Sequence, residues 1–298
     1  MAFSSTTQLM VDSTFRIPTS VKLDGQPSYF FHRKSGWEDK ADGSTADYGA
    51  DRDRQKFTFA IWLKRNKLTD NPTVDTSNRQ HIFEITDNPP ENTGEWTSGT
   101  LDRILFDHED KLVIQFDNAS DQDNVINLTT NAQFRDVSNW YHILVSVDTT
   151  ESAFANRVKL YINGTRYTDF AAVAEANFPA ENDAFDCMLY HPFTYQYIGG
   201  KSSNEGGNGG LSTLFANIVE CHYIEDYALT PTTFGEFGKY GEFKPIKTSG
   251  ITYTYQSFYH PFQEGFGNTR GFSAVTYTGN GTSQQVFTGL DNTDLVWI

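Results

Sequence analysis

Alternation of apolar and polar residues with a period of two is the feature that most restricts how this chain can fold. Three segments carry it: Phe57–Lys64, Trp140–Asp148 and Arg157–Ile162. In the first segment the apolar positions are Phe57, Phe59, Ile61 and Leu63. Successive side chains of a β-strand point to opposite faces, so each segment predicts a strand with one buried face.

A tight turn follows the third segment directly. Asn163-Gly164 is a strong hairpin signal, because both residues tolerate the positive φ angles of a type I′ turn, and the chain is expected to return along Thr165–Phe170. Further strands are expected at Ser28–His32, Gln80–Thr86, Leu101–Phe106, Lys111–Phe116, Asn124–Thr129, Gln196–Gly199 and Leu214–Ile224. No long helical segments separate them, which favours two stacked antiparallel sheets over a parallel α/β fold.

One short helix is predicted near the end of this series. Thr230 is its expected N-cap, Pro231 takes the first helical position, and the helix is expected to continue over Thr232–Gly238.

The charge balance excludes some partners. Lys and Arg number 23 against 38 Asp and Glu, so the net charge is 23 − 38 = −15. Such a chain repels phosphate backbones and anionic lipid, so we expect neither nucleic acid nor a membrane surface as partner. No segment has the about 18–20 apolar residues of a membrane-spanning helix, and Met1–Thr7 shows no signal peptide. We therefore expect synthesis in a cytoplasm.

The chain has two cysteines, Cys187 and Cys221, without the spacing of a zinc site. Two reduced, buried thiols are the expected state, and a disulfide between them is the alternative.

Several motifs in order resemble a known family. They are Phe57–Arg65 (FTFAIWLKR), Trp140–Thr150 (WYHILVSVDTT), Asn156–Tyr167 (NRVKLYINGTRY), Tyr197–Gly200 (YIGG) and Ala228–Glu236 (ALTPTTFGE). This succession resembles laminin-G-like domains of the concanavalin A-like lectin/glucanase superfamily, in particular those in structural proteins of tailed, often marine, bacteriophages. The resemblance covers about residues 20–247. It implies an all-β, two-sheet antiparallel jelly-roll sandwich.

The chain is expected to have three parts. From its position and polarity, the segment 1–20 is expected to be an N-terminal arm that anchors the protein, and residues 21–247 are expected to form the sandwich. Residues 248–298 are expected to form an aromatic-rich linker and a short C-terminal β extension, whose end resembles the opening strands of a second module. The chain ends on the apolar residues Leu295–Ile298, so we expect either that this strand pairs with another, such as one from a neighbouring subunit, or that it belongs to a longer module that has been cut.

A virion component is the function that the resemblance implies: a fibre, spike or decoration protein that contacts other virion proteins and a host surface glycan. Such proteins are commonly homotrimers. The alternatives are a stand-alone carbohydrate-binding module and a glycan-degrading enzyme. Retaining glucanases of this fold place two carboxylates about 5 Å apart through a Glu-x-Asp-x-(x)-Glu strand pattern. Neither Glu84–Asp87 nor Glu220–Glu225 has that spacing, so we expect no catalytic residues.

Calcium is the cofactor that the sequence favours. Asp117, Asp121 and Asp123 bring three carboxylates into one short loop, which is the oxygen-rich setting that Ca²⁺ prefers. The alternative for this loop is a solvated turn. The loop Asp42–Asp53 is a weaker candidate site.

Sugar recognition needs a displayed aromatic ring, and the tryptophans in loops are Trp37 and Trp96. Either ring is alternatively packed against the sandwich. Trp62 and Trp140 lie in predicted strands and are expected to be structural, and His142 is expected to be a buried, hydrogen-bonded histidine.

Overall fold

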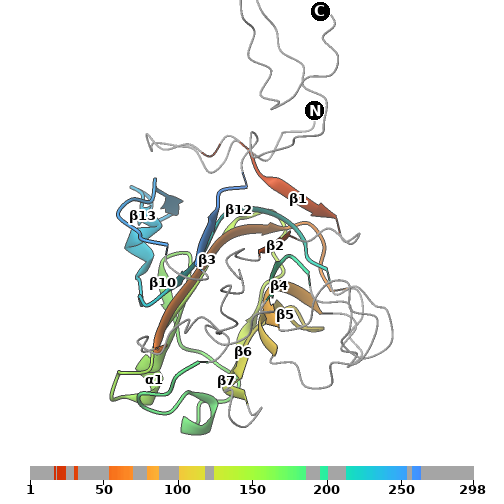
Figure 1. The fold of residues 1–298 in the computed structure, drawn as a ribbon. Helices are drawn as coiled ribbons and strands as arrows, with labels where there is room; N and C mark the ends of the chain where they lie inside the picture. Colours follow the sequence, from red (N-terminus) through yellow and green to blue (C-terminus); the bar gives the residue numbers. More distant parts are fainter. Residues whose placement is uncertain are drawn as a thin grey trace, which may run out of the picture.

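Two antiparallel sheets face each other across an apolar core (Figure 1). The computed structural model describes residues 17, 19–24, 30–32, 54–69, 79–86, 101–117, 124–185, 195–200, 213–253 and 257–262. Sheet A has the strand order β1-β12-β3-β8-β9-β10, and β15 also pairs with β12. Its strands are β1 (Val21–Asp24), β3 (Lys56–Arg65), β8 (Tyr141–Asp148), β9 (Val158–Ile162), β10 (Thr165–Tyr167), β12 (Phe215–Glu225) and β15 (Phe258–His260).

Sheet B has the order β2-β11-β4-β5-β6-β7. Its strands are β2 (Phe30–His32), β4 (Gln80–Thr86), β5 (Leu101–Phe106), β6 (Lys111–Asp117), β7 (Asn124–Gln133) and β11 (Tyr195–Ile198). A separate two-stranded sheet consists of β13 (Gly235–Phe237) and β14 (Phe243–Pro245). The predicted all-β sandwich is confirmed, and the predicted strands agree with the observed ones to within a few residues.

The period-two alternation explains the core. The odd positions of β3, from Phe57 to Leu63, are all fully buried against sheet B. Phe59 stacks on Phe83 of β4 with ring centroids 4.7 Å apart, and Phe57 lies 4.9 Å from Phe116 of β6. These aromatic pairs join the two sheets, as expected where rings from both inner faces interdigitate.

A β-bulge in β12 changes which residues face the core. Ala216 and Ile218 are core residues before the bulge, and Cys221 and Tyr223 are core residues after it. Glu220 lies between them with φ of 48°, and the register with β3 shifts at this point. Even-numbered residues of β12 face the core before the bulge and odd-numbered residues face it afterwards, because the bulge inserts one extra residue. The alternation of buried and exposed positions is therefore regular within each half of the strand but not across the bulge. Cys221 is a free, buried thiol whose pKa burial raises.

Sheet A is also covered on its outer face. Residues 229–253 pack over it, and Figure 1 shows β13 on the side of β3 away from sheet B. One cluster joins Ala60, Leu144 and Ile224 to Phe234, and another joins Trp62 to Phe243. Sheet A is therefore a middle layer over part of its area, which accounts for the fully buried positions on both faces of β3.

The helix predicted over residues 230–238 is wrong in extent and type. The chain makes one 3₁₀ turn, η5 (Pro231–Thr233), with Pro at its start and no side-chain cap from Thr230. It then enters β13, which pairs with β14 in antiparallel register from Gly235↔Pro245 to Phe237↔Phe243. The Phe243 ring packs on sheet A, so tertiary packing overrides the local helix signal.

A buried charge network fixes the loop that precedes β8. Arg65 is fully buried, and its Nη2 lies 2.8 Å from Asp110 Oδ1 while its Nη1 donates to the Phe134 carbonyl at 2.7 Å. Asp110 also accepts from Thr69 and from Arg135 Nε at 3.0 Å. Burial raises the pKa of Asp110, but the hydrogen bonds from Thr69 and the Arg65 charge outweigh it and lower the pKa overall. The network holds residues 134–135, next to the cleft described below.

Candidate binding cleft

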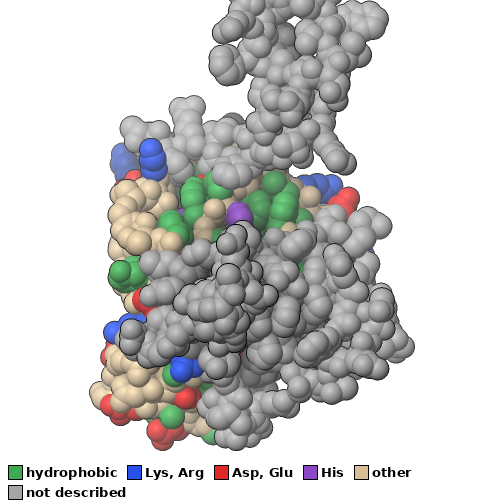
Figure 2. Space-filling model, in the orientation of Figure 1, with side chains coloured by type: hydrophobic (Ala, Val, Ile, Leu, Met, Phe, Trp, Pro, Cys, Tyr) green, Lys and Arg blue, Asp and Glu red, His purple; other side chains and the backbone are tan. Residues whose placement is uncertain are grey.

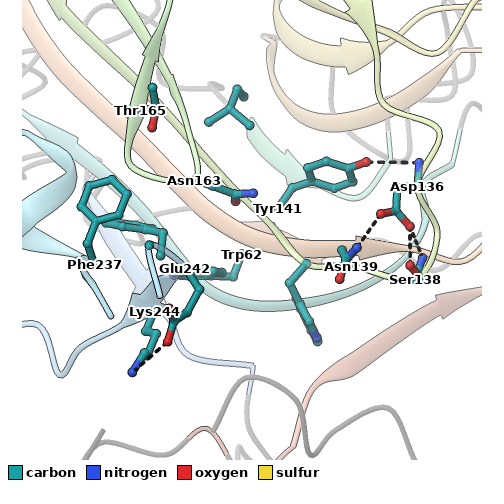
Figure 3. A pocket seen from close by; sticks show the side chains of 14 residues that line it. Trp62, Asp136, Ser138, Asn139, Tyr141, Asn163, Thr165, Phe237, Glu242 and Lys244 are labelled. Atoms are coloured by element: carbon teal, nitrogen blue, oxygen red, sulfur yellow. Dashed lines mark hydrogen bonds and ion pairs between the residues drawn. The ribbon is translucent and has the colours of Figure 1, made fainter. Parts of the chain in front are cut away.

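A cleft of about 620 Å³ opens between the β13–β14 hairpin and the loop before β8 (Figure 3). Sheet A contributes its floor through Trp62, Tyr141 and Ile162. The lining combines aromatic rings with amide, hydroxyl and charged groups. The full set is Trp62, Asp136, Ser138, Asn139, Trp140, Tyr141, Ile162, Asn163, Thr165, Phe237, Gly241, Glu242, Phe243 and Lys244.

One wall is the loop Asp136–Asn139. Asp136 Oδ1 accepts from the Ser138 backbone N–H at 2.7 Å, and Oδ2 accepts from Asn139 Nδ2 at 2.5 Å. The hydrogen bonds from Ser138 and Asn139 lower the pKa of Asp136 to about 2, so this carboxylate is ionised at neutral pH. The Asp136 backbone N–H donates to the Tyr141 hydroxyl at 3.2 Å, which ties the loop to the first residue of β8.

The turn between β9 and β10 forms the upper edge in Figure 3. Asn163 and Gly164 have φ angles of 48° and 77°, as the predicted type I′ turn requires. Asn163 Oδ1 accepts from the His142 backbone N–H at 2.7 Å, which fixes the amide orientation. A Cβ added to Gly164 would lie 2.4 Å from Phe243 Cδ2, so the close approach of the hairpin requires glycine here.

The β13–β14 hairpin forms the opposite wall. Phe243 stacks on Trp62 with ring centroids 5.7 Å apart and planes 12° apart, and Phe237 meets Phe243 edge-on at 5.2 Å. Glu242 Oε2 accepts from the Tyr240 backbone N–H at 2.9 Å, and Glu242 Oε1 lies 3.3 Å from Lys244 Nζ. The pKa of Glu242 is lowered by the backbone N–H groups of Glu242 itself and of Tyr240 and by Lys244.

Two indole N–H groups in the lining are buried without a hydrogen-bond partner. Trp62 is 2% exposed, Trp140 is half-buried, and within the described part of the chain neither Nε1 atom has an acceptor. Buried tryptophan N–H groups usually find a partner, because leaving one unpaired costs about 1–3 kcal/mol. Both nitrogens are enclosed by the chain, so they carry this cost within the fold, and a ligand meets the accessible parts of the indole rings.

One exposed aromatic ring lies in the lining: Phe237, which is 55% exposed. Two further exposed apolar residues are sequence neighbours of lining residues, Val137 beside Asp136 and Tyr240 beside Gly241. The cleft therefore offers a ligand an accessible ring, as binding surfaces commonly do.

The predicted sugar-binding residues Trp37 and Trp96 and the predicted calcium ligands Asp121 and Asp123 lie outside the described residues. Asp117, the third predicted calcium ligand, is the last residue of β6. In the described ranges, no group of three or more His, Cys, Asp or Glu side chains is placed to hold a metal ion. The calcium site therefore stays a prediction.

The two glutamates considered above as candidate catalytic carboxylates, Glu84 and Glu220, lie in different sheets. Glu84 of β4 is fully buried and lies 2.9 Å from His81 Nδ1. Glu220 of β12 lies at the bulge and accepts from the Tyr259 hydroxyl at 2.8 Å. Each glutamate therefore contacts a side chain of its own sheet, and the two do not form a carboxylate pair.

Trp140 and His142 depart from the sequence interpretation. Trp140 directly precedes β8, whereas the sequence interpretation placed it in the strand, and it lines the cleft. His142 is fully buried as expected, but neither ring nitrogen has a hydrogen-bond partner in the described part of the chain. The Gly238–Gly241 turn, with aromatic residues on both sides, is the sequence signal that would have located the cleft.

Comparisons with known proteins give the family. Residues 38–187, half of the chain, match a family model described as the concanavalin A-like lectin/glucanases superfamily. No curated protein sequence matches the chain. Among the described residues, no helix has the length and apolarity needed to cross a bilayer.

Three solved structures are similar. Domains LG4-5 of the mouse laminin alpha1 chain are 10% identical, with 71% of this chain and 42% of that chain covered at a TM-score of 0.40. The binding domain of Paraclostridial Mosquitocidal Protein 1 is 16% identical, with 56% and 32% covered at 0.33. The CBM40 of Ruminococcus gnavus IT-sialidase bound to alpha2,3 sialyllactose is 12% identical, with 55% and 75% covered at 0.33.

This chain thus spans less than half the length of the first two structures. The family match and the two facing antiparallel sheets lead to one conclusion: the chain belongs to the concanavalin A-like lectin/glucanase superfamily and contains a laminin-G-like domain.

Proposed function

We propose that this chain is a non-catalytic binding protein that attaches to a glycan through the cleft between the β13–β14 hairpin and the loop Asp136–Asn139. The observation that carries the proposal is the lining itself, which places aromatic rings such as Trp140 and Phe237 beside polar side chains such as Asn163. Apolar walls with a few placed polar groups are typical of sites that bind small ligands. Sugars present both an apolar C–H face and hydroxyl groups. The cleft has aromatic rings for the first and amide and hydroxyl side chains for the second.

The test is binding of the intact chain to a printed glycan array, followed by titration of any bound glycan. Phe237→Ala removes the exposed ring of the lining and should weaken binding at least about tenfold, because aromatic anchors dominate such contacts. Tyr227→Ala is the matched control, since Tyr227 is 48% exposed and does not line the cleft. It should bind as the unchanged chain does.

The proposal fails if no glycan binds, or if binding survives Phe237→Ala. Thermal unfolding of both variants accompanies the titrations. Because the replaced rings are exposed, we expect little change in stability.

We further propose that the biological setting is a tailed-phage virion, in which the chain serves as a fibre, spike or decoration protein and the glycan belongs to the host surface. The support is the succession of motifs from FTFAIWLKR to YIGG. A homotrimer that contacts other virion proteins is the assembly expected in that setting. The solution mass of the intact chain tests it.

A further inference from the structure

We infer that the cleft selects neutral sugars and discriminates against sugars that carry a carboxylate or sulfate. The inference rests on the proposed glycan binding and narrows it to one ligand class. It is drawn from the fixed charges of the lining, from its unpaired hydrogen-bonding groups and from its exposed ring.

Carboxylates outnumber cations in the lining. The charged side chains are Asp136, Glu242 and Lys244. Lys244 lies 3.3 Å from Glu242, so its charge is already offset by the nearer carboxylate. Arg135, the residue next to Asp136, donates instead to Asp110 at 3.0 Å. An anionic ligand would therefore meet a net negative site.

The anion on the loop wall is fixed in place. Asp136 accepts from Ser138 and Asn139, and these bonds hold its pKa near 2. It does not become neutral to accommodate a second carboxylate at physiological pH. The repulsion therefore applies over the whole range in which such a sugar is ionised.

The unpaired groups of the lining match hydroxyls, which both donate and accept. Asn163 uses its oxygen for the His142 backbone, which leaves its Nδ2 as a donor, and Asn139 uses its Nδ2 for Asp136, which leaves its oxygen as an acceptor. Burial raises the pKa of Tyr141, so its hydroxyl keeps a proton to donate. Donors and acceptors thus alternate around one cavity.

An exposed ring supplies the apolar surface. Phe237 lies on the hairpin wall and is 55% exposed, and its ring meets Phe243 edge-on at 5.2 Å. Its exposed surface can pack against the C–H face of a neutral pyranose.

The test is calorimetric titration of the intact chain with matched pairs of glycans, such as lactose against 3′-sialyllactose and galactan against polygalacturonan. The neutral member of a recognised pair should bind about tenfold more tightly, as expected for one unit of charge near two partly screened carboxylates. Glu242→Gln and Asp136→Asn keep an acceptor oxygen and remove the charge, so each should narrow that ratio. Glu236→Gln is the control, because it removes a charge from the same hairpin at an exposed position outside the lining.

Each outcome has one meaning. A neutral preference that shrinks in Glu242→Gln and not in Glu236→Gln supports the inference. Equal or tighter binding of the anionic member overturns it while leaving glycan binding in place. If neither member of any pair binds, and no glycan of the array binds, the proposed function fails and the inference fails with it.

Discussion

The buried side chain of His142 makes the stability of this fold depend on pH. It lies on the outer face of sheet A, 4.8 Å from the Trp62 ring and 5.2 Å from the Phe243 ring. Complete burial lowers its pKa to about 3, and burial together with the nearby His142 lowers the pKa of His222 to about 3 as well. Both histidines are therefore neutral in the folded protein.

Stability should fall as the pH drops below 6.5. Between pH 6.5 and about 3 the unfolded chain binds a proton at His142 that the folded chain does not, so the free energy of unfolding rises with pH in this window. His142→Leu should reduce that slope by up to about 1.4 kcal/mol per pH unit. Urea unfolding of both proteins at about pH 7.5, 5.5 and 4.5 measures this dependence of the free energy of unfolding on pH. Parallel curves for the two proteins below pH 6 would contradict the prediction.

At the scale of elements, the β9–β10 turn both closes a hairpin and seats the β13–β14 hairpin. Gly164 has φ of +77°, and a Cβ there would meet Phe243 Cδ2 at 2.4 Å and Phe237 Cζ at 2.9 Å. Gly164→Ala should therefore cost about 2–4 kcal/mol, the sum of left-handed strain and overpacking. Urea unfolding gives the cost, and weaker glycan binding should accompany it because the cleft wall is displaced.

Gly250→Ala separates the two contributions. Gly250 has a similar φ of +75°, and a Cβ there would meet nothing within 4 Å. This variant should lose only the strain, about 1 kcal/mol. Equal losses in the two variants would show that the approach of Phe243 to the turn does not constrain residue 164.

The loop between β6 and β7 carries the proposed calcium site. Asp117 ends β6 in register with Asn124, which begins β7, so the loop joins two neighbouring strands. If the loop binds Ca²⁺, a chelator should lower the unfolding midpoint, by the equivalent of about 2–3 kcal/mol when the initial Ca²⁺ is near 100 times its dissociation constant. Asp121→Ala should abolish the difference between chelated and Ca²⁺-loaded samples. An unchanged midpoint on chelation would contradict the prediction that this loop binds Ca²⁺.

At the scale of the whole molecule, the virion proposal predicts an oligomer. Light scattering on a size-exclusion column should give a mass near three times the 33.7 kDa of one chain. A closed trimer of a virion fibre is stable at the micromolar concentrations of such a column because obligate interfaces are large. A monomeric mass would favour a stand-alone carbohydrate-binding module instead.

Much of the fold was predictable from local patterns. Alternation in β3, β8 and β9 specified their buried faces, and Asn163-Gly164 specified the hairpin. The second burial layer was not predictable in this way, because it depends on contacts between residues that are distant in the sequence, such as Phe243 on Trp62. The same tertiary contact turned a predicted helix into η5 and β13.

The candidate site was harder to predict than the fold. Sequence reasoning places sugar-binding rings on loops and so selected Trp37 and Trp96. The cleft instead brings together Trp62 and Trp140 with Phe237 from three separate segments. Only the folded chain shows that the Trp62 N–H remains unpaired, since that depends on what every neighbouring element offers.

The β13–β14 hairpin forms its own two-stranded sheet, and its strands are hydrogen-bonded to neither large sheet. Its hold on the sandwich comes from side chains such as Phe243, and its turn, Gly238–Gly241, faces the cleft mouth. Insertions or substitutions in that turn therefore alter no strand register in the sandwich. A lineage can thus diversify what the protein recognises within one short, contiguous stretch of coding sequence while the scaffold stays under unchanged selection.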